Sequence, residues 1–269
     1  TEMSQSQTYA TILAEERRGG FRHAALAALV VLVCIAALWI TGFFDSRRFV
    51  EGIPALAQLA SEMVPPDFTR WQAWLKPLLD TLAMSIAGTV LAVILSLPLA
   101  ILAAPNTSPN MAVCQLARTL LALLRSIPEI ILGVIFVAAV GFGALPGVLA
   151  LALHSVGMVA KFYAEAIEHV DPKPLEAARA AGATPLQVIT HSVLPQVFPQ
   201  LADITLYRWE YHFRASAVLG IVGAGGIGFE LMAALRLIAY DQVSAILLSI
   251  LACVVVVDWL GSRLRKALK

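Results

Sequence analysis

The stretch Glu176-Ala-Ala-Arg-Ala-Ala-Gly182, which continues to Leu194-Pro195, is a fairly polar segment inside a very apolar chain. Asp171 can cap a first helix that a following proline opens, and Gly182 can end this helix. Thr184-Pro185-Leu186-Gln187 then has the form of a capping box with proline at the first helical position. These residues predict a helix, a sharp turn and a second helix. Because the first helix is almost all alanine, it offers a smooth surface that a groove on a partner can accept.

The composition places the rest of the chain in a membrane. Hydrophobic residues make up 59% of the 269 residues, charged residues only 14%, and the mean hydropathy is +0.80. Such values are not those of a soluble globular domain. A formal net charge of +1, with no basic patch among aromatic residues, argues against nucleic-acid binding. The three cysteines lie far apart in apolar runs, which argues against a metal centre and a disulfide framework.

Apolar runs of about 20 residues, long enough to cross the hydrocarbon of a membrane, recur along the chain. The first follows a polar tail and precedes no obvious cleavage site, so we expect a retained span rather than a signal peptide. Lysines and arginines near the span ends gather on the side of the polar segment, which predicts that this side, with both termini, is cytoplasmic. We predict an all-α bundle of about six transmembrane helices, near residues 24–44, 78–103, 112–140, 147–163, 199–222 and 242–260.

Two polar clusters fall inside predicted spans, where charged groups are costly and usually face a cavity or one another. The first, Arg125-Ser126-Ile127-Pro128-Glu129, interrupts the third span. One interpretation is a proline kink with an Arg125–Glu129 pair at helical spacing; the other is the lining of a polar cavity. The single His154 in the fourth span predicts a hydrogen bond between helices rather than a ligand role.

The second cluster, residues 207–214, begins the fifth span. At helical spacing Glu210 can pair with Arg214, and Tyr211 and Arg214 share a face. An arginine held there at low dielectric would attract an oxyanion, because a guanidinium suits bidentate recognition of phosphorus oxygens. Alternatively, the arginines extend to the headgroups. We expect Arg208 to reach the headgroups and leave both interpretations open for Arg214.

A glycine-rich stretch, Gly223-Ala-Gly225-Gly226-Ile-Gly228, has the letters of a dinucleotide-binding fingerprint. We reject that interpretation because the stretch follows a membrane helix and no alternating βαβ pattern surrounds it. The glycines instead predict a sharp re-entrant bend or a close contact between helices. The chain contains no Gly-Lys dipeptide, and therefore no Walker A loop that could hold ATP phosphates.

The spacing of Glu176-Ala-Ala, Gly182, Ile189 and Leu194-Pro195 resembles the cytoplasmic coupling motif of permease subunits of ABC importers. Three further stretches resemble the phosphonate-type branch of these permeases, which includes relatives that carry phosphite: residues 65–71, 206–210 and 214–228. The resemblance covers the chain from about Pro65 to its C-terminus. It implies the type I importer fold, with no enzymatic activity, cofactor or metal in this chain.

The resemblance further implies a homodimer in the lipid of the bacterial inner membrane. Two ATP-binding subunits, which bind ATP and Mg²⁺, and a periplasmic substrate-binding protein would complete an importer for a phosphonate or phosphite. Coupling to the ATPase would involve Glu176, Ala177, Ala178, Gly182, Ala183, Leu194 and Pro195. The translocation pathway would be lined by Arg125, Ser126, Pro128, Glu129, Tyr211, Arg214, Gly223, Gly225 and Gly226.

On this basis the chain divides into a cytoplasmic tail 1–23, a transmembrane helix 24–44, a periplasmic or interfacial segment 45–77, a core permease domain 78–262 with the coupling segment 171–195, and a cytoplasmic tail 263–269. Trp71 and Trp74 are typical of a segment at headgroup level. The alternatives are a permease for another small solute such as an amino acid, a passive channel and a membrane enzyme. An enzyme would cluster its acids, histidines or nucleophiles at one depth, whereas Asp80, His154 and Asp258 are scattered. A passive channel would not need a docking segment.

Overall fold

The computed structural model describes residue 20 and residues 23–268, and these residues form helices and turns without any strand. Contacts divide the chain into two compact units, Thr1–Ser61 and Glu62–Lys269. Among the described residues, four helices are long and apolar enough to cross a membrane, and the number rises to six if each of two bent helix pairs is one span. The predicted all-α bundle with about six spans is confirmed.

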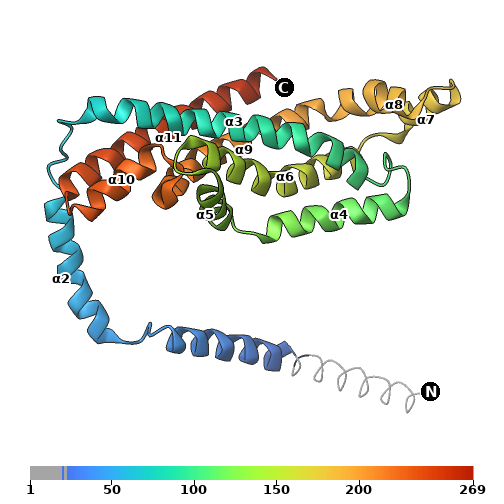
Figure 1. Cartoon of the computed structure of the whole chain (residues 1–269). Helices are drawn as coiled ribbons and strands as arrows, with labels where there is room; N and C mark the ends of the chain where they lie inside the picture. Colours follow the sequence, from blue (N-terminus) through green and yellow to red (C-terminus); the bar gives the residue numbers. More distant parts are fainter. Residues whose placement is uncertain (1–19, 21–22, 269) are drawn as a thin grey trace, which may run out of the picture. The chain divides into compact units, whose positions relative to one another are not determined.

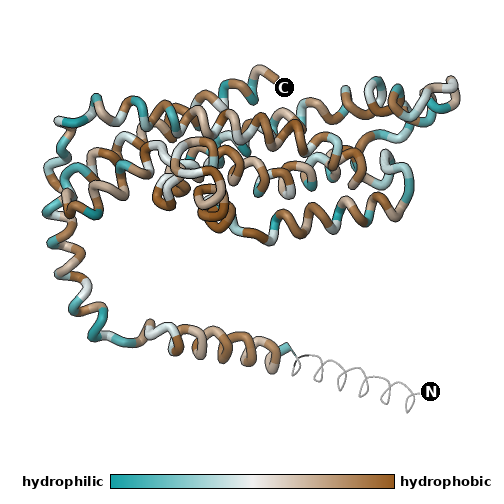
Figure 2. The backbone as a smooth tube through the Cα atoms, viewed as in Figure 1, coloured by the Kyte–Doolittle hydropathy of each residue, from teal (hydrophilic) through white to brown (hydrophobic). Residues whose placement is uncertain are grey.

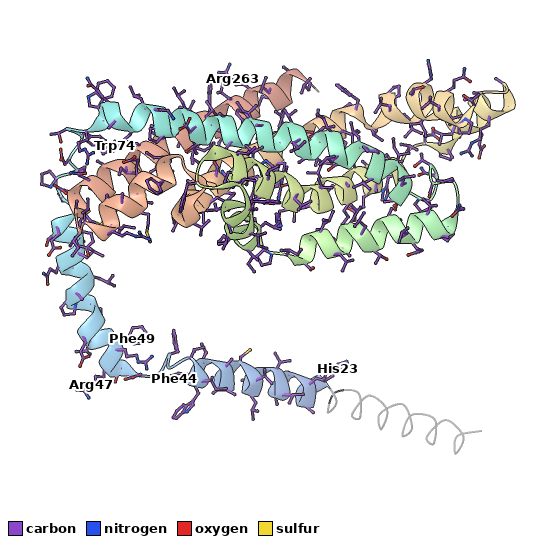
Figure 3. All side chains as sticks on the ribbon, viewed as in Figure 1. His23, Phe44, Arg47, Phe49, Trp74 and Arg263 are labelled. Carbon is purple, nitrogen blue, oxygen red and sulfur yellow. The ribbon has the colours of Figure 1, made fainter. Side chains whose placement is uncertain are left out.

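From residue 23 onward, the first unit consists of two helices and the turn between them. The apolar helix His23–Ile40 coincides with most of the predicted first span, and none of its residues is buried within the chain. A turn leads to α2 (Ser46–Glu62), and in this turn Phe43 packs edge-on against Phe44 and Phe49, with ring centroids 5.8 and 5.9 Å apart. Figure 3 labels both partners of Phe43. Most of the predicted tail, 1–23, lies outside the described residues.

The second unit is a helical bundle, and the three long helices α3, α6 and α9 form its centre. The segment with α7 and α8 lies at one end of this bundle and α10 at the other (Figure 1). The elements are α3 (Trp71–Ala103), α4 (Met111–Ser126), α5 (Glu129–Val140), α6 (Ala144–Glu168), α7 (Pro172–Ala180), α8 (Pro185–Val188), the π-helical turn η1 (Ile189–Val193), α9 (Leu194–Leu219), the π-helical turn η2 (Gly220–Ala224), α10 (Ile227–Arg236) and α11 (Tyr240–Ala267).

Hydropathy follows this arrangement. Figure 2 shows hydrophobic residues along α4, α5 and the helix His23–Ile40, whereas hydrophilic residues gather around α7 and the turn after it. The helix α6 is buried along most of its length, with Ala150, Leu151 and Ala160 at 0% exposure. A helix that is apolar on all sides and enclosed by others is expected at the centre of a membrane bundle. The polar segment at residues 171–195 therefore differs in hydropathy from the apolar helices of the bundle.

Two boundaries differ from the sequence prediction. The helix α3 begins at Trp71 rather than near residue 78, so that residues 71–77 continue a span. Trp74, labelled in Figure 3, is 2% exposed and shares a buried cluster with Ile227 of α10 and Ile246 of α11. Its ring is therefore buried in protein, whereas the expectation that it lies at headgroup level stays a prediction. The helix α11 continues to Ala267, through most of the predicted tail.

Candidate functional site

The segment 171–195 folds through local caps. Asp171 accepts a hydrogen bond from the Lys173 amide at 3.0 Å, and the proline between them opens α7. Gly182 has a φ of +82°, a left-handed conformation that glycine adopts without a steric penalty, and it turns the chain after α7. The Gln187 amide donates to the Thr184 hydroxyl at 3.4 Å, and the Thr184 amide donates to Gln187 Oε1 at 2.8 Å. The predicted helix, turn and capping box are confirmed.

This segment buries one face and presents the other. Leu175 and Val188 are 4% exposed and belong to the same core cluster as Tyr163 of α6. Of the residues predicted for coupling, Ala178 and Ala183 are half-buried against this cluster, and the exposed ones are Glu176, Ala177, Gly182, Leu194 and Pro195. An exposed surface that includes Ala177 and Gly182 is therefore held on a buried base.

Hydrogen bonds join α7 to its neighbours at both ends. Gln196, in the first turn of α9, accepts a hydrogen bond from the Asp171 amide at 3.0 Å. Arg179 donates to the carbonyl of Asn106, in the loop before α4, at 3.4 Å. Because of these links, a displacement of α7 is transmitted to the start of α9 and to the α3–α4 loop.

The third span is broken, with α4 and α5 meeting at 82° across Ile127-Pro128. The break takes Arg125 and Glu129 out of a common helix, so the first interpretation holds for the proline break and not for the pair between these two residues. Arg125 Nε donates to a carbonyl of its own helix at 3.3 Å, and Glu129 accepts a hydrogen bond from the Tyr211 hydroxyl at 2.9 Å. His154 Nδ1 lies 3.1 Å from the Ile127 carbonyl, so its hydrogen bond joins α6 to the break between α4 and α5 rather than to a second helix.

Near mid-length, α3, α6 and α9 bring together four buried polar side chains, which we call the polar centre: Thr89, Ser155, Arg208 and His212. Ser155 Oγ lies 2.8 Å from Arg208 Nε and 2.5 Å from His212 Nε2. His212 Nδ1 lies 2.7 Å from Thr89 Oγ1, which donates to the Ser85 carbonyl at 2.7 Å. Because arginine can only donate, Ser155 Oγ accepts from Arg208. Both ring nitrogens of His212 have a hydroxyl partner, Ser155 on one side and Thr89 on the other.

The Arg208 guanidinium is only partly satisfied by the polar centre. Its Nη1 lies 3.3 Å from Met158 Sδ, and its Cζ lies 4.2 Å from the centre of the Tyr211 ring, a cation–π contact. Its buried Nη2 has no hydrogen-bond partner among the described residues, and the same holds for Glu129 Oε2. Tyr211 therefore contacts a buried cation and a half-buried carboxylate, each with one buried atom that has no hydrogen-bond partner among the described residues.

Arg208 and Arg214 differ from the expectations. Arg208 is 4% exposed, so the expectation that it reaches the headgroups is wrong. Arg214 lies 3.0 Å from Asp258 of α11, with side chains 45% and 44% exposed. Glu210 pairs with Arg265 of α11 at 2.7 Å instead of with Arg214. The helix α9 thus directs Arg208 toward α6 and the other two charged residues toward α11.

The glycine-rich stretch forms the predicted sharp bend. Gly223, Gly225 and Gly226 have φ angles of +99°, +76° and +68°, and the chain turns by 57° before α10. Thr81 Oγ1, from α3, accepts the Ile227 amide proton at 2.9 Å and so caps the start of α10. Left-handed backbone at three positions explains the glycines.

The residues predicted for the pathway fall into three places. Glu129 and Tyr211 are in direct contact, and Arg125, Ser126 and Pro128 lie at the adjacent break. Arg214 is paired with α11, and the three glycines lie at the bend before α10. Only the first group borders the polar centre.

None of the four members of the polar centre, Thr89, Ser155, Arg208 and His212, was predicted as a site residue. The i, i+4 spacing of Arg208 and His212 places both on one helix face, and this is the signal that could have identified them. Ser155 offers no such signal, because its role depends on α6 packing against α9.

The chain matches known transport proteins over most of its length. Residues 96–269 match the family described as binding-protein-dependent transport system inner membrane component. The phosphite transport system permease protein PtxC of Stutzerimonas stutzeri is 60% identical over 251 residues, which cover 93% of this chain and 91% of that protein. The putative phosphite transport system permease protein HtxC of the same organism is 39% identical, over 91% of this chain and 86% of that protein.

A solved methionine ABC transporter in inward-facing conformations has a similar fold. Its matching chain gives a TM-score of 0.66 and 23% identity, over 75% of this chain and 99% of that chain. Identity at this level shows the fold alone, and it confirms the predicted type I importer permease fold.

Proposed function

Because this chain belongs to the family of binding-protein-dependent transport system inner membrane components, we propose that it is the permease subunit of an ABC importer for a phosphorus oxyanion, phosphite or a phosphonate. The observation that carries this proposal is the 60% identity with a phosphite permease across 93% of the chain. The multi-pass helical bundle and the exposed coupling surface support it.

The importer contains two copies of this chain, two ATP-binding subunits and a periplasmic substrate-binding protein, and ATP and Mg²⁺ bind to the ATP-binding subunits. The exposed surface around Glu176, Ala177 and Gly182 docks on an ATP-binding subunit. Both chain termini and α7 are cytoplasmic. The excess of Lys and Arg near the span ends on the α7 side supports this orientation.

Closure of the ATP-binding subunits moves α7, and the bond between Asp171 and Gln196 transmits the motion to α9. The same helix carries Arg208 and Tyr211, and Tyr211 is bonded to Glu129 at the start of α5. A shift of α9 therefore changes the contact between α9 and the broken span. Such a rearrangement of packed helices is a common route from a small displacement to a change of access.

The test is uptake by cells that express this chain with its ATP-binding subunit and binding protein, supplied with phosphite or methylphosphonate as sole phosphorus source. Uptake of either compound, lost when the ATPase is inactivated by mutation, is the expected result. An assembled complex that imports neither compound would contradict the phosphorus assignment.

A further inference from the structure

Arg208 lies near the middle of α9, about 21 Å along the helix from Leu194 and about 17 Å from Leu219 at 1.5 Å per residue. Its contact Ser155 is also near the middle of α6. A cation at this depth of a membrane bundle is costly, and such residues usually meet a counter-charge or line a path for ions.

Unlike several other arginines in the bundle, Arg208 has no carboxylate of the described residues bound directly to it. Direct carboxylate partners are present for three of these, in the pairs Arg214–Asp258, Arg265–Glu210 and Arg118–Glu168. Within the described part of the chain, Arg208 forms no ion pair, and its contacts are a hydroxyl, a thioether and an aromatic ring. The Glu129 carboxylate acts on this charge electrostatically but forms no direct bond with it, so the buried guanidinium has no paired counter-charge among these residues and keeps one unfilled donor.

Tyr211 covers this guanidinium in the present conformation. Its ring lies over Arg208 Cζ, and its hydroxyl is held by Glu129 Oε1 at 2.9 Å. Glu129 is the first residue of α5, so the second half of the broken span holds the cover in place. A shift of α5 against α9 breaks this hydrogen bond and frees the ring to leave the guanidinium.

We propose that Arg208 binds the transported oxyanion inside the membrane and that Tyr211 is the cover of this site. This inference rests on the proposed function and names the residue that meets the substrate. A phosphorus oxygen accepts from Arg208 Nη2 and supplies the missing counter-charge in a charge-assisted hydrogen bond. Glu129 Oε2 requires a donor, and the P–OH group of a singly protonated phosphite or phosphonate provides one. The ligand class is thus a tetrahedral phosphorus oxyanion that carries both a negatively charged oxygen, which accepts from Arg208, and a P–OH group, which donates to Glu129.

The test uses the complete importer in proteoliposomes, with phosphite as the probe. We would measure the maximal rate of phosphite uptake and the ATP hydrolysis that the loaded binding protein stimulates, for the wild type, Arg208→Gln and Arg208→Lys. Arg118→Lys is the matched control, because it keeps the charge that faces Glu168.

Arg208→Gln is expected to lower uptake by about tenfold to hundredfold, the loss that follows from one hydrogen bond to a charged group. Arg208→Lys is expected to lower uptake less, since it keeps the charge but loses the planar fork. Stimulated ATP hydrolysis stays near the wild-type rate in both variants, and the control transports normally.

If Arg208→Gln takes up phosphite at the wild-type rate, the inference is overturned. It is also overturned if this variant loses uptake and ATP hydrolysis to the same extent, because that result would show a structural role. If the importer with Arg208→Gln does not assemble, the uptake and ATP hydrolysis of Arg208→Lys are judged by the same criteria. A wild-type importer that takes up no phosphite contradicts the proposed function itself, whereas the other outcomes concern Arg208 alone.

Discussion

Residues 171–195 hold their shape through bonds between near neighbours, such as Asp171 with Lys173 and Thr184 with Gln187, and leave the surface around Glu176, Ala177 and Gly182 exposed. The polar centre is held by bonds between distant parts of the chain: Arg208 and Ser155 are 53 residues apart, and both are buried. A segment of the first kind can move as one piece on its buried base. A cluster of the second kind changes only when whole helices shift.

The helix α9 connects these two regions, since it begins beside α7 and carries Arg208 near its middle. The difference between the two regions predicts which property a substitution in each of them should impair. Changes on the exposed surface should disturb the contact with a partner and leave the fold intact. Changes in the polar centre should disturb the fold or the passage of the substrate.

The largest effect is expected at the turn of the coupling segment. Gly182→Val should abolish phosphite uptake while the chain remains in the membrane. A β-branched residue at a φ of +82° costs about 1–2 kcal/mol, and its side chain enters the docking surface. Uptake assays and a membrane immunoblot would measure both quantities.

Gly182→Asn is the matched control, because asparagine tolerates the left-handed conformation and should retain much of the uptake. Normal uptake by Gly182→Val would remove this surface from the coupling mechanism.

In the polar centre, Ser155→Ala should lower the free energy of unfolding by about 1–3 kcal/mol, because Arg208 and His212 each lose a partner and stay buried. Denaturant titration of the purified chain in detergent micelles would measure this change in the free energy of unfolding. Ser249→Ala is the control, since this hydroxyl donates to a carbonyl of its own helix. Equal stability of the two variants would show that the polar centre does not hold α6 to α9.

The smallest effect is expected from Thr184→Ala, which removes the cap of α8 and should cost about 1 kcal/mol. The loss is local, so hydrogen exchange should increase in α8 and leave α6 unchanged. Exchange that increases throughout the bundle would mean that the coupling segment is not an independent piece.

The features that could be predicted from the sequence depend on neighbours in the chain. The caps at Asp171 and Thr184, the turn at Gly182, the break at Pro128 and the bend at the glycines all follow from local backbone chemistry. The predicted pairs of charged residues were less reliable. Helical spacing placed Arg125 near Glu129, but the break between them removed the common helix on which that spacing depends.

The polar centre could not be predicted in this way. Arg208 and Arg214 lie on the same helix, and neither spacing nor composition tells which one faces α6. That choice depends on how α3, α6, α9 and α11 pack, which supplies Ser155 to one arginine and Asp258 to the other. The burial of Trp74 could not be predicted for the same reason, because it depends on α10 and α11.

The most direct test compares phosphite imported per ATP hydrolysed in reconstituted importers that carry Gly182→Val or Arg208→Lys. If the coupling segment delivers motion and the polar centre meets the substrate, Gly182→Val lowers the stimulated ATP hydrolysis and uptake together. Arg208→Lys then lowers uptake while ATP hydrolysis continues, so that the ratio falls. The same pattern of loss in both variants would contradict this division between the two regions.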